Sequence, residues 1–348
     1  MAVPLDSKAD DNLIDTLRRK TIDVVGSLIP RDRPVALLDF PRYSNVGDAA
    51  IWLGEISCLA ACGIPRDHVR YMCDVATYSE SNLRRSIGES GFILLHGGGN
   101  FGDLWAGHQQ FRETVIAAFP NNPIVVLPQS IHFTEPRALD TAAVAFNRHG
   151  DLTVLVRDQA SLDVLRERFT TCNILCPDMA FCLGKLDRPV EADRDIVYLA
   201  RVDKESQFSA DTRVRAGITA VDWPDVANVR TWQLGNALGD FQANHPRIAR
   251  SLRAPIQAFV RSSYGAMSTE RLTLGNSLLA RGRVVVTDRL HVHILALLMR
   301  IPHVVLDNNY GKIRRFHDAW TTDSALTRVA GSLDEAFELA AAMLREAV

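Results

Sequence analysis

The amino-acid sequence predicts an α/β protein built from two doubly wound, Rossmann-like domains with a ligand cleft between them. Short apolar runs recur along the chain, each ends in a polar segment, and most are followed by apolar residues at helical spacing. The length of 348 residues suits two domains with separate cores. A charged segment containing Gly and Pro, residues 184–194, divides the pattern, so we expect an N-terminal domain over residues 1–188 and a C-terminal domain over residues 189–348.

The first predicted element is an amphipathic helix over residues 12–29, with Leu and Val on one side and charged residues on the other. Its basic residues Arg18, Arg19 and Lys20 would suit contact with an anionic membrane surface. A helix packed against the first domain explains the same pattern, and we favour this interpretation.

The N-terminal half then alternates strands and helices. A strand at residues 35–40 leads into a polar segment and a helix beginning near Ala49, where Asp48 is placed to cap exposed N–H groups. Further strands with polar residues directly after them are predicted at residues 92–95, 124–127, 153–156 and 172–176.

Three consecutive glycines, residues 97–99, follow the predicted strand at residues 92–95 and precede Asn100 and Asp103. Glycine lets the backbone approach a ligand closely, and successive N–H groups can cradle an anion, although a plain tight turn explains the glycines as well. The spacing matches neither the dinucleotide-binding fingerprint nor the phosphate-binding loop, so neither is predicted.

The C-terminal half continues the alternation. The expected strands lie at residues 196–200, 219–223, 284–287 and 303–306. The expected helices lie at residues 228–244, 247–262, around 294–299 and at 333–347, with a polar connection after Tyr264.

The densest group of ionisable residues, Asp288, Arg289, His291 and His293, follows the strand at residues 284–287. Polar residues at the carboxyl end of a parallel strand face the crevice where open α/β sheets bind ligands, so we expect chemistry here. Two positions along a helix turn a side chain through roughly 200°, which predicts that His293 points away from His291 and packs inside. Asp288 is expected either to cap the strand end or to orient Arg289.

The composition excludes several classes of function. The formal net charge of -2 provides no global positive field for nucleic acid. No apolar run approaches the roughly 18 residues of a membrane span, and the N-terminus lacks the order of a signal peptide, so we expect a cytoplasmic protein. The six cysteines form no CxxC pair, which predicts reduced, mostly buried thiols.

In order and spacing, the polar segments after the strands resemble the motifs of the polysaccharide pyruvyl transferase family over about residues 35–318. The matching segments are Asn45–Asp48, His96–Asn100, Pro128–Ser130, Val156–Asp158 with Ser161, Pro177–Phe181, Thr287–His291 and Lys312. Within the family, Asp307–Ile313 is most similar to bacterial exopolysaccharide ketal-pyruvate transferases. The resemblance also implies a glycosyltransferase-B-like arrangement, with the acceptor on the N-terminal domain and the donor on the C-terminal domain.

The resemblance implies transfer of the enolpyruvyl-derived unit of phosphoenolpyruvate to sugar hydroxyls, forming a pyruvate ketal and releasing phosphate, in the synthesis of exopolysaccharide or another surface glycan. It assigns donor binding and catalysis to Arg157, Arg289 and His291, and Lys312 can add a positive charge to the donor site. Arginine binds carboxylate and phosphate through paired hydrogen bonds, and histidine is a natural general acid near neutral pH. Phosphoenolpyruvate is a co-substrate, and neither a cofactor nor a metal is expected.

Four polar residues of the other half, Asp48, His96, Asn100 and Asp103, are expected to meet the acceptor sugar, with Asp103 as a candidate base. A turn or cap role explains Asp48 equally well, and the same holds for Asp178.

The aromatic residues Trp105, Tyr310 and Trp320 could stack on a sugar ring, although aromatic side chains more often pack in a core. The acceptor could be carried on polyprenyl diphosphate, on a nucleotide or within a polymer. A lipid-linked acceptor would bring the protein to the inner face of the cytoplasmic membrane, through the helix at residues 12–29. The oligomeric state stays open.

Rival functions belong to other classes. A nucleotide-sugar-dependent glycosyltransferase of the same fold is the nearest alternative, because fold does not fix function. A metal-dependent hydrolase would use His291 and His293 as ligands near Asp288, but the remaining chain supplies too few further ligands. An esterase lacks its GxSxG motif, and a non-catalytic sugar-binding protein is disfavoured by the presence of Arg157, Arg289 and His291.

Overall fold

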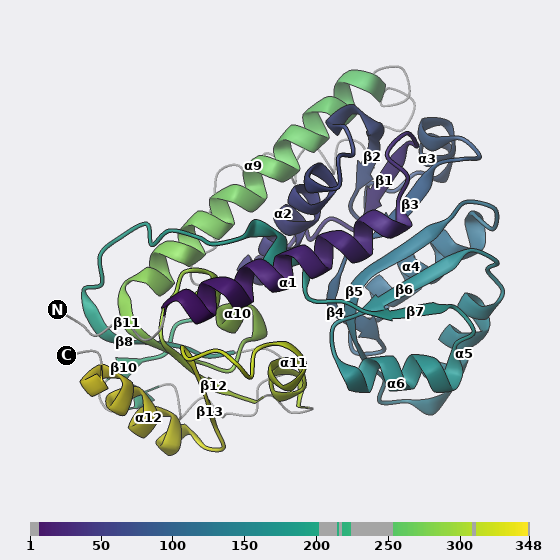
Figure 1. Ribbon diagram of the computed structural model, residues 1–348. Helices are drawn as coiled ribbons and strands as arrows, with labels where there is room; N and C mark the ends of the chain where they lie inside the picture. Colours follow the sequence, from purple (N-terminus) through teal and green to yellow (C-terminus); the bar gives the residue numbers. More distant parts are fainter. Residues whose placement is uncertain (1–6, 202–213, 216–217, 224–252, 308–310, 347–348) are drawn as a thin grey trace.

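The computed structural model describes residues 7–201, 214–215, 218–223, 253–307 and 311–346. Its N-terminal half holds a seven-stranded parallel sheet in the order β2-β1-β3-β5-β6-β7, with β4 paired to β5 (Figure 1). The strands are β1 Val35–Leu38, β2 Val69–Cys73, β3 Phe92–Leu95, β4 Gly98–Gly102, β5 Ile124–His132, β6 Leu152–Val156 and β7 Cys172–Leu175. The strand order reverses at β1 and β3, where doubly wound sheets bind ligands.

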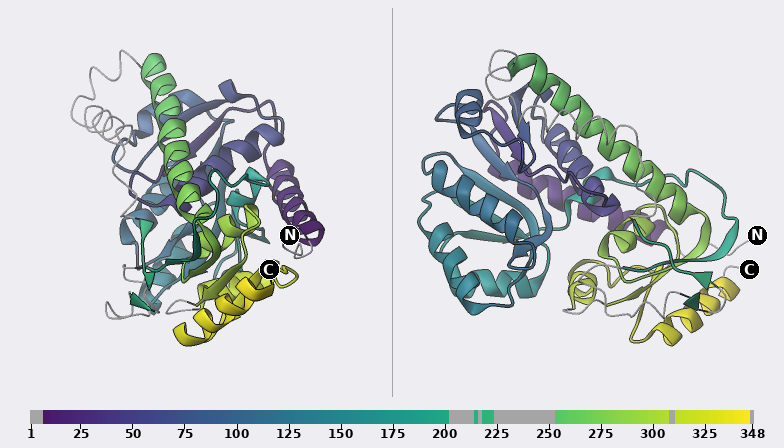
Figure 2. Two further views of the ribbon diagram at one scale, coloured as in Figure 1. Left: turned by 90° about the vertical axis from the view of Figure 1, so that its left-hand side faces the viewer. Right: turned by 180° about the vertical axis from the view of Figure 1, so that it is seen from behind.

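Helices cover both faces of this sheet, so its strands are buried on both sides (Figure 2). Val35 and Leu37 pack toward α1, α2 and α9, whereas Ala36 and Leu38 pack toward α3, α4, α5 and α6, as the two-residue period of a strand requires. These helices are α1 Ser7–Leu28, α2 Val46–Ala61, α3 Glu80–Ile87, α4 Ala106–Ala118, α5 Pro136–Asn147, α6 Gln159–Arg168 and α9 Arg253–Ala280, with short 3₁₀ turns η1 Arg66–His68 and η2 Met179–Leu183.

The C-terminal half holds a four-stranded parallel sheet in the order β13-β12-β11-β8. Its strands are β8 Arg194–Leu199, β11 Gly282–Thr287, β12 His303–Leu306 and β13 Thr327–Ala330, beside a short antiparallel pair, β9 Val214–Arg215 and β10 Ile218–Thr219. Its helices are α10 Leu290–Leu298, α11 Lys312–Trp320 and α12 Leu333–Glu346. Helix α12 covers one face, while α10 and α11 cover the other. The predicted α/β class with Rossmann-like parallel sheets is confirmed.

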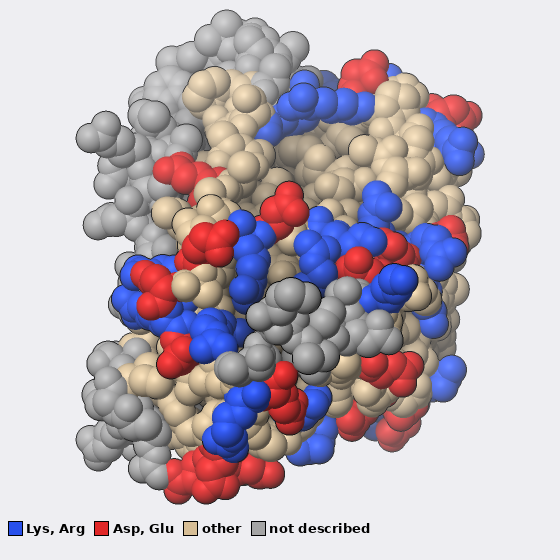
Figure 3. Space-filling view, turned by 60° about the vertical axis from the view of Figure 1, so that its left-hand side comes forward, with Lys and Arg blue, Asp and Glu red and all other residues tan. Residues whose placement is uncertain are grey.

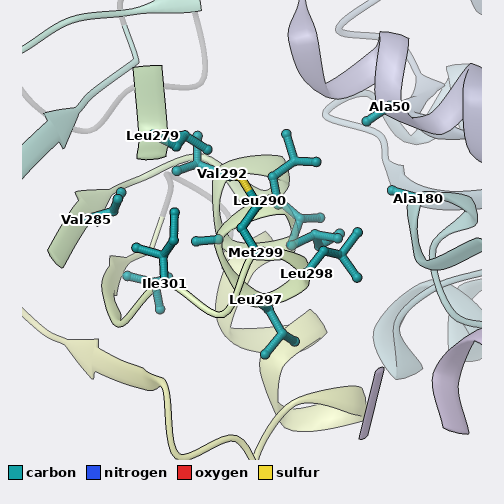
Figure 4. Close-up of a cluster of buried hydrophobic side chains, with 14 of the residues drawn as sticks. Ala50, Ala180, Leu279, Val285, Leu290, Val292, Leu297, Leu298, Met299 and Ile301 are labelled. Carbon is teal, nitrogen blue, oxygen red and sulfur yellow. The ribbon is translucent and has the colours of Figure 1, made fainter. Parts of the chain in front are cut away.

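Helix α10 lies where the two halves meet. Its apolar side chains share one core with Ala50 of α2 and Ala180 of η2 (Figure 4). Fully burying one Leu, Ile or Met side chain stabilises a protein by about 1.5–3 kcal/mol, so this shared core holds the two sheets together strongly. The functional turn at the start of α10 is thereby fixed against the N-terminal half.

Two long helices also contact both halves (Figure 1). Helix α1 packs on α2 and η2 of the N-terminal half and on α10, and the ammonium group of Lys20 lies 4.6 Å from the Trp320 ring centroid. The docked interpretation of this helix is therefore confirmed. Helix α9 contacts β2 and α2 at one part of its length and β11 at another.

The glycine segment and the strand beside it differ from the prediction. The glycines do not form a tight turn; Gly98 to Gly102 form β4, parallel to β5. Strand β5 does not end at Leu127 but continues through Pro128, and a register shift between Val126 and Gln129 accommodates the missing proline N–H.

The predicted polar connection after Tyr264 is wrong, because α9 continues to Ala280. The hydroxyls of Thr273 and Ser277 donate to carbonyls four residues earlier, which allows a polar sequence to remain helical. The helix predicted at residues 228–244 lies outside the described residues, as does Tyr310.

Basic and acidic side chains are interspersed on the face shown in Figure 3, in keeping with the small net charge. Within the described ranges, none of the helices combines the length and apolar content needed to cross a bilayer. All six cysteines are free thiols, and only Cys172 is exposed, as the sequence predicts.

Candidate active site

A cavity of about 420 Å³ lies between the carboxyl ends of the two sheets, within the size range of small-molecule sites. The N-terminal half contributes the segment after β1, part of β4 and the start of α4. The C-terminal half contributes the segments after β8 and β10 and the starts of α10 and α11. The charged and histidine side chains that line it are Asp48, His108, Arg201, Asp222, Arg289, His291 and Lys312.

Behind His291, a buried ion pair joins Arg157 and Asp178. Nη1 of Arg157 donates to Oδ2 of Asp178, and Nε of Arg157 donates to the Ser130 hydroxyl at 3.0 Å. Nε2 of His291 lies 3.4 Å from both Nη1 of Arg157 and Oδ2 of Asp178. The structure thus brings together Arg157 and His291, which lie 134 positions apart in the chain.

Local structure fixes each member of this group. Arg157 directly follows β6, and its backbone carbonyl accepts a hydrogen bond from Nε1 of Trp320 at 2.8 Å. Asp178 caps η2 by accepting from the Ala180 N–H at 2.9 Å. Burial alone would raise the pKa of the Asp178 carboxyl, but Arg157 and His291 outweigh it and hold that pKa well below its ordinary value. Asp178 therefore has the predicted cap role and is also the charged partner of Arg157.

Two cations from different halves converge on Gly99. A Cβ atom at this glycine would collide with Nζ of Lys312 and would lie 3.0 Å from Nη2 of Arg157. Nη2 of Arg157 is buried and has no hydrogen-bond partner among the described residues. Since a buried guanidinium nitrogen without a partner is costly, this position favours an anionic ligand.

Arg289 is held by Asp222 on the opposite wall. Nε and Nη2 of Arg289 donate to the two carboxylate oxygens at 2.6 and 2.7 Å, and the two side chains are 7% and 1% exposed. Such a two-point contact fixes the plane of the guanidinium group.

Asp288 does not orient the Arg289 side chain, so one of its two predicted roles is wrong. Its Oδ1 accepts from the Arg201 N–H at 2.8 Å, which ties the end of β11 to the end of β8. Burial raises the pKa of Asp288 to about 6, because that hydrogen bond and the nearby arginines only partly offset desolvation.

Of the four residues predicted to meet the acceptor, Asp48 and Asn100 line the cavity. Asp48 is not the cap of α2, because the helix begins at Val46 and the Asn45 side chain accepts from the Gly47 N–H at 2.8 Å. Asn100 is fixed by Arg112, which donates to its Oδ1 at 2.7 Å.

The other two predicted acceptor residues, His96 and Asp103, are absent from the cavity lining. His96 is buried, with Nδ1 2.9 Å from the Glu55 carboxylate; burial would lower its pKa, but Glu55 raises it overall. The Asp103 carboxylate accepts from the N–H groups of Thr134 and Glu135, and these hydrogen bonds outweigh burial and lower its pKa. A carboxylate that already accepts these hydrogen bonds is a poor base, which argues against Asp103 as the base for the acceptor hydroxyl.

His108 takes the position that sequence reasoning gave to Asp103. It lines the cavity, and its Nδ1 lies 2.9 Å from Oδ1 of Asp39. Asp39 directly follows β1 and has a φ of 70°, an uncommon conformation for a residue other than glycine. The aromatic rings of Tyr43, Trp105 and Trp223 complete the apolar lining, whereas Trp320 is buried outside it.

His293 points away from His291, as the helical period predicts. It is fully buried, with Nδ1 2.7 Å from Nε2 of His303 and Nε2 3.0 Å from the Thr321 hydroxyl. Burial lowers its pKa well below the ordinary value. The two histidines of the HVH segment therefore do not converge, and the part of the chain that the structure describes contains no cluster of three or more His, Cys, Asp or Glu side chains suited to a metal ion.

Sequence reasoning misses Asp222, His108 and Asp39. Asp222 and Asp39 are each the next-to-last residue of a predicted strand, at residues 219–223 and 35–40, so their nearness to the carboxyl ends of strands was a usable signal. His108 lies within α4 and carries no such signal, since its partner is 69 positions away.

Comparison with known proteins identifies the family. The model of the family described as polysaccharide pyruvyl transferase matches residues 45–258 and 277–310. The chain belongs to the polysaccharide pyruvyl transferase family. Membership supports transfer of a pyruvyl unit in polysaccharide biosynthesis.

Two relatives named as pyruvyl transferases are similar in sequence to this protein along most of its chain. Pyruvyl transferase 1 of Schizosaccharomyces pombe is 33% identical over 322 residues, covering 88% of this chain and 75% of the relative. EpsO of Bacillus subtilis, also named as a pyruvyl transferase, is 30% identical over 303 residues, covering 87% and 90%. A crystal structure of an uncharacterized Klebsiella pneumoniae protein matches with a TM-score of 0.58 at 16% identity, over 91% of this chain and 99% of that one, and supports the fold.

Proposed function

We propose that this pyruvyl transferase takes its donor unit from phosphoenolpyruvate and joins it to two hydroxyls of a sugar as a pyruvate ketal. One observation carries the proposal: Nζ of Lys312, on the cavity wall, and Nη2 of Arg157, buried behind that wall, converge on Gly99, and Arg289 and His291 line the same cavity. Phosphoenolpyruvate carries a carboxylate and a phosphate, so it requires cationic groups at more than one position.

In the proposed reaction, His291 donates a proton to the methylene carbon of the donor. The first sugar hydroxyl bonds to the neighbouring carbon as its proton passes to Nε2 of His108. A second hydroxyl then bonds to that carbon while the carbon–oxygen bond to phosphate breaks, and phosphate leaves with the electron pair of that bond and the proton of the second hydroxyl. The Asp178 carboxylate lies 3.4 Å from Nε2 of His291 and can orient the imidazole ring for the first step. A positioned acid of this kind commonly contributes about 10²–10⁴-fold.

The acceptor lies on the side of Asp48, Asn100 and His108 in this proposal. Because Asp39 faces Nδ1 of His108, that nitrogen carries the proton and Nε2 can accept a hydrogen bond from a sugar hydroxyl. Tyr43 and Trp105 supply aromatic surface for a sugar ring.

The acceptor class we propose is a surface glycan or its lipid-linked precursor, including a polyprenyl-diphosphate-linked oligosaccharide, met at the inner face of the cytoplasmic membrane. Comparing phosphate release with free and lipid-linked oligosaccharide distinguishes the two forms. Side-chain cations suffice to hold the donor, so we expect phosphate release to be unchanged by EDTA.

The test is calorimetric binding of phosphoenolpyruvate to the wild type, Arg289→Ala and the control Arg281→Ala, whose side chain pairs with Asp193 on the surface. We expect binding to the wild type and the control, and a loss of at least tenfold in affinity in Arg289→Ala. A folded wild type that fails to bind phosphoenolpyruvate, with and without an acceptor sugar, would overturn the proposal.

A further inference from the structure

We propose that Asp222 is a positioning residue for the donor, acting through Arg289. The inference rests on the proposed function and extends it to a residue outside the family motifs noted above. Its basis is the two-point ion pair, in which both oxygens of Asp222 accept from Arg289 at 2.6 and 2.7 Å on the cavity wall.

Backbone pairing holds Asp222 in place. The residue before it, Val221, forms a parallel bridge with Leu199 at the end of β8, through hydrogen bonds of 3.0 Å to Tyr198 and Ala200. Oδ1 of Asp222 also accepts from the Trp223 N–H at 2.7 Å. The carboxylate is thus anchored to the strand that lies beside β11, whose end carries Arg289.

Arg289 lines the cavity in which the donor is proposed to bind. A guanidinium group has five N–H donors in a fixed plane, and Asp222 accepts from Nε and Nη2, so this contact sets the plane in which Arg289 meets a donor carboxylate or phosphate. Arg289 begins α10 in an extended conformation without a side-chain cap bond of its own. Asp222, rather than the neighbouring Asp288, therefore sets the plane of this guanidinium.

Two effects oppose each other when Asp222 is neutralised. The local positive charge rises, which favours an anion, while Arg289 loses the contact that sets its plane. Arg201 and Lys312 line the cavity and keep it cationic in either case, whereas a paired contact with a planar anion depends on the orientation of Arg289. We therefore expect orientation to dominate.

The experiment is calorimetric binding of phosphoenolpyruvate to the full chain and to Asp222→Asn, with Asp193→Asn as a matched control. Asp193 accepts from Nε and Nη2 of Arg281 in the same two-point manner, but on the surface. We expect at least a tenfold loss of affinity in Asp222→Asn and no change in Asp193→Asn. If Asp222→Asn fails to fold, Asp222→Glu, which keeps the charge and displaces the carboxylate, is expected to weaken binding as well.

A double-mutant cycle separates positioning from a purely structural role. In an Arg289→Lys background, the Asp222→Asn change is expected to alter affinity by less than twofold, since its target is already gone. Equal or tighter binding by Asp222→Asn, or a full tenfold loss that persists in the Arg289→Lys background, would overturn the inference. Absence of binding by the wild type would instead overturn the proposed function, and the inference with it.

Discussion

Asp178 and Asp288 occupy comparable places in the two halves of the molecule. Each lies just beyond a parallel strand, β7 or β11, and each is 1% exposed. Burial raises the pKa of both carboxyls, yet the pKa of Asp178 ends well below its ordinary value while that of Asp288 rises to about 6. The direction of the shift is therefore decided by something other than burial.

The two carboxyls differ in whether a guanidinium group contacts them directly. Arg157 donates directly to Asp178, whereas Arg289, next to Asp288 in the chain, donates to Asp222. An opposite charge in direct contact outweighs desolvation, and an arginine committed elsewhere does not. Proximity in sequence thus does not identify the partner of a charged residue in this site.

The largest expected effect comes from removing the positive charge of the Arg157–Asp178 ion pair. Arg157→Gln leaves Asp178 buried without its partner, which costs about 3–5 kcal/mol of unfolding free energy. We also expect phosphoenolpyruvate binding to be lost. Denaturant unfolding and calorimetry measure the two effects. Arg300→Gln is the control, because its partner Asp11 is partly exposed; equal destabilisation by both variants would contradict the prediction.

The second prediction concerns Asp288 and pH. The pKa of Asp288 is higher in the folded than in the unfolded chain, so the folded state binds the proton more tightly; this group lowers the stability of the protein as pH rises from its unfolded pKa to about 6, and the loss levels off above that pH. Asp288→Asn should therefore gain stability relative to the wild type by about 2 kcal/mol between pH 4 and pH 7.5. The measurement is denaturant unfolding across that range, and a difference independent of pH would refute the assignment.

The alternation of strands and helices could be read from the sequence because each buried parallel strand is a run of apolar residues and each ends in polar ones. The same rule drew attention to Arg289 and His291, which follow β11, whereas the family resemblance singled out Arg157, which follows β6. The structure brings Arg157 and His291 within 3.4 Å of each other, and the topology of parallel strands explains how residues after different strands meet.

The partners of these residues could not be read in the same way. Asp222 and Arg289 are 67 positions apart, and no local pattern links them. Asp103, predicted as an acceptor residue, lies outside the cavity lining, and its carboxylate accepts from the N–H groups of Thr134 and Glu135, 31 and 32 positions away. Such pairings depend on tertiary packing, which periodicity does not encode.

The third prediction tests the convergence of cations from the two halves. In Gly99→Ala, the added methyl group displaces the flexible end of Lys312 and crowds Nη2 of Arg157, so phosphoenolpyruvate affinity should fall about tenfold, or by about 1.4 kcal/mol. The thermal midpoint should change little, because flexible side-chain ends can shift. Gly107→Ala has open space around its Cβ position and serves as the control. Unchanged phosphoenolpyruvate binding in Gly99→Ala would show that Lys312 and Arg157 do not bind the donor at this position.

The smallest expected effect tests how the halves are joined behind the site. Trp320 of α11 donates its Nε1–H to the Arg157 carbonyl at 2.8 Å, while Lys312 begins the same helix. Trp320→Phe keeps an aromatic side chain but removes this donor, which should cost about 1 kcal/mol of unfolding free energy. Because the contact fixes α11 against the end of β6, we also expect phosphoenolpyruvate affinity to fall two- to fivefold. Trp105→Phe, on the acceptor side of the cavity, should leave donor binding unchanged. Trp320→Phe could lose stability but bind phosphoenolpyruvate like the wild type. In that case the hydrogen bond from Trp320 to the Arg157 carbonyl would join the two halves without setting the distance between the Arg157 and Lys312 side chains.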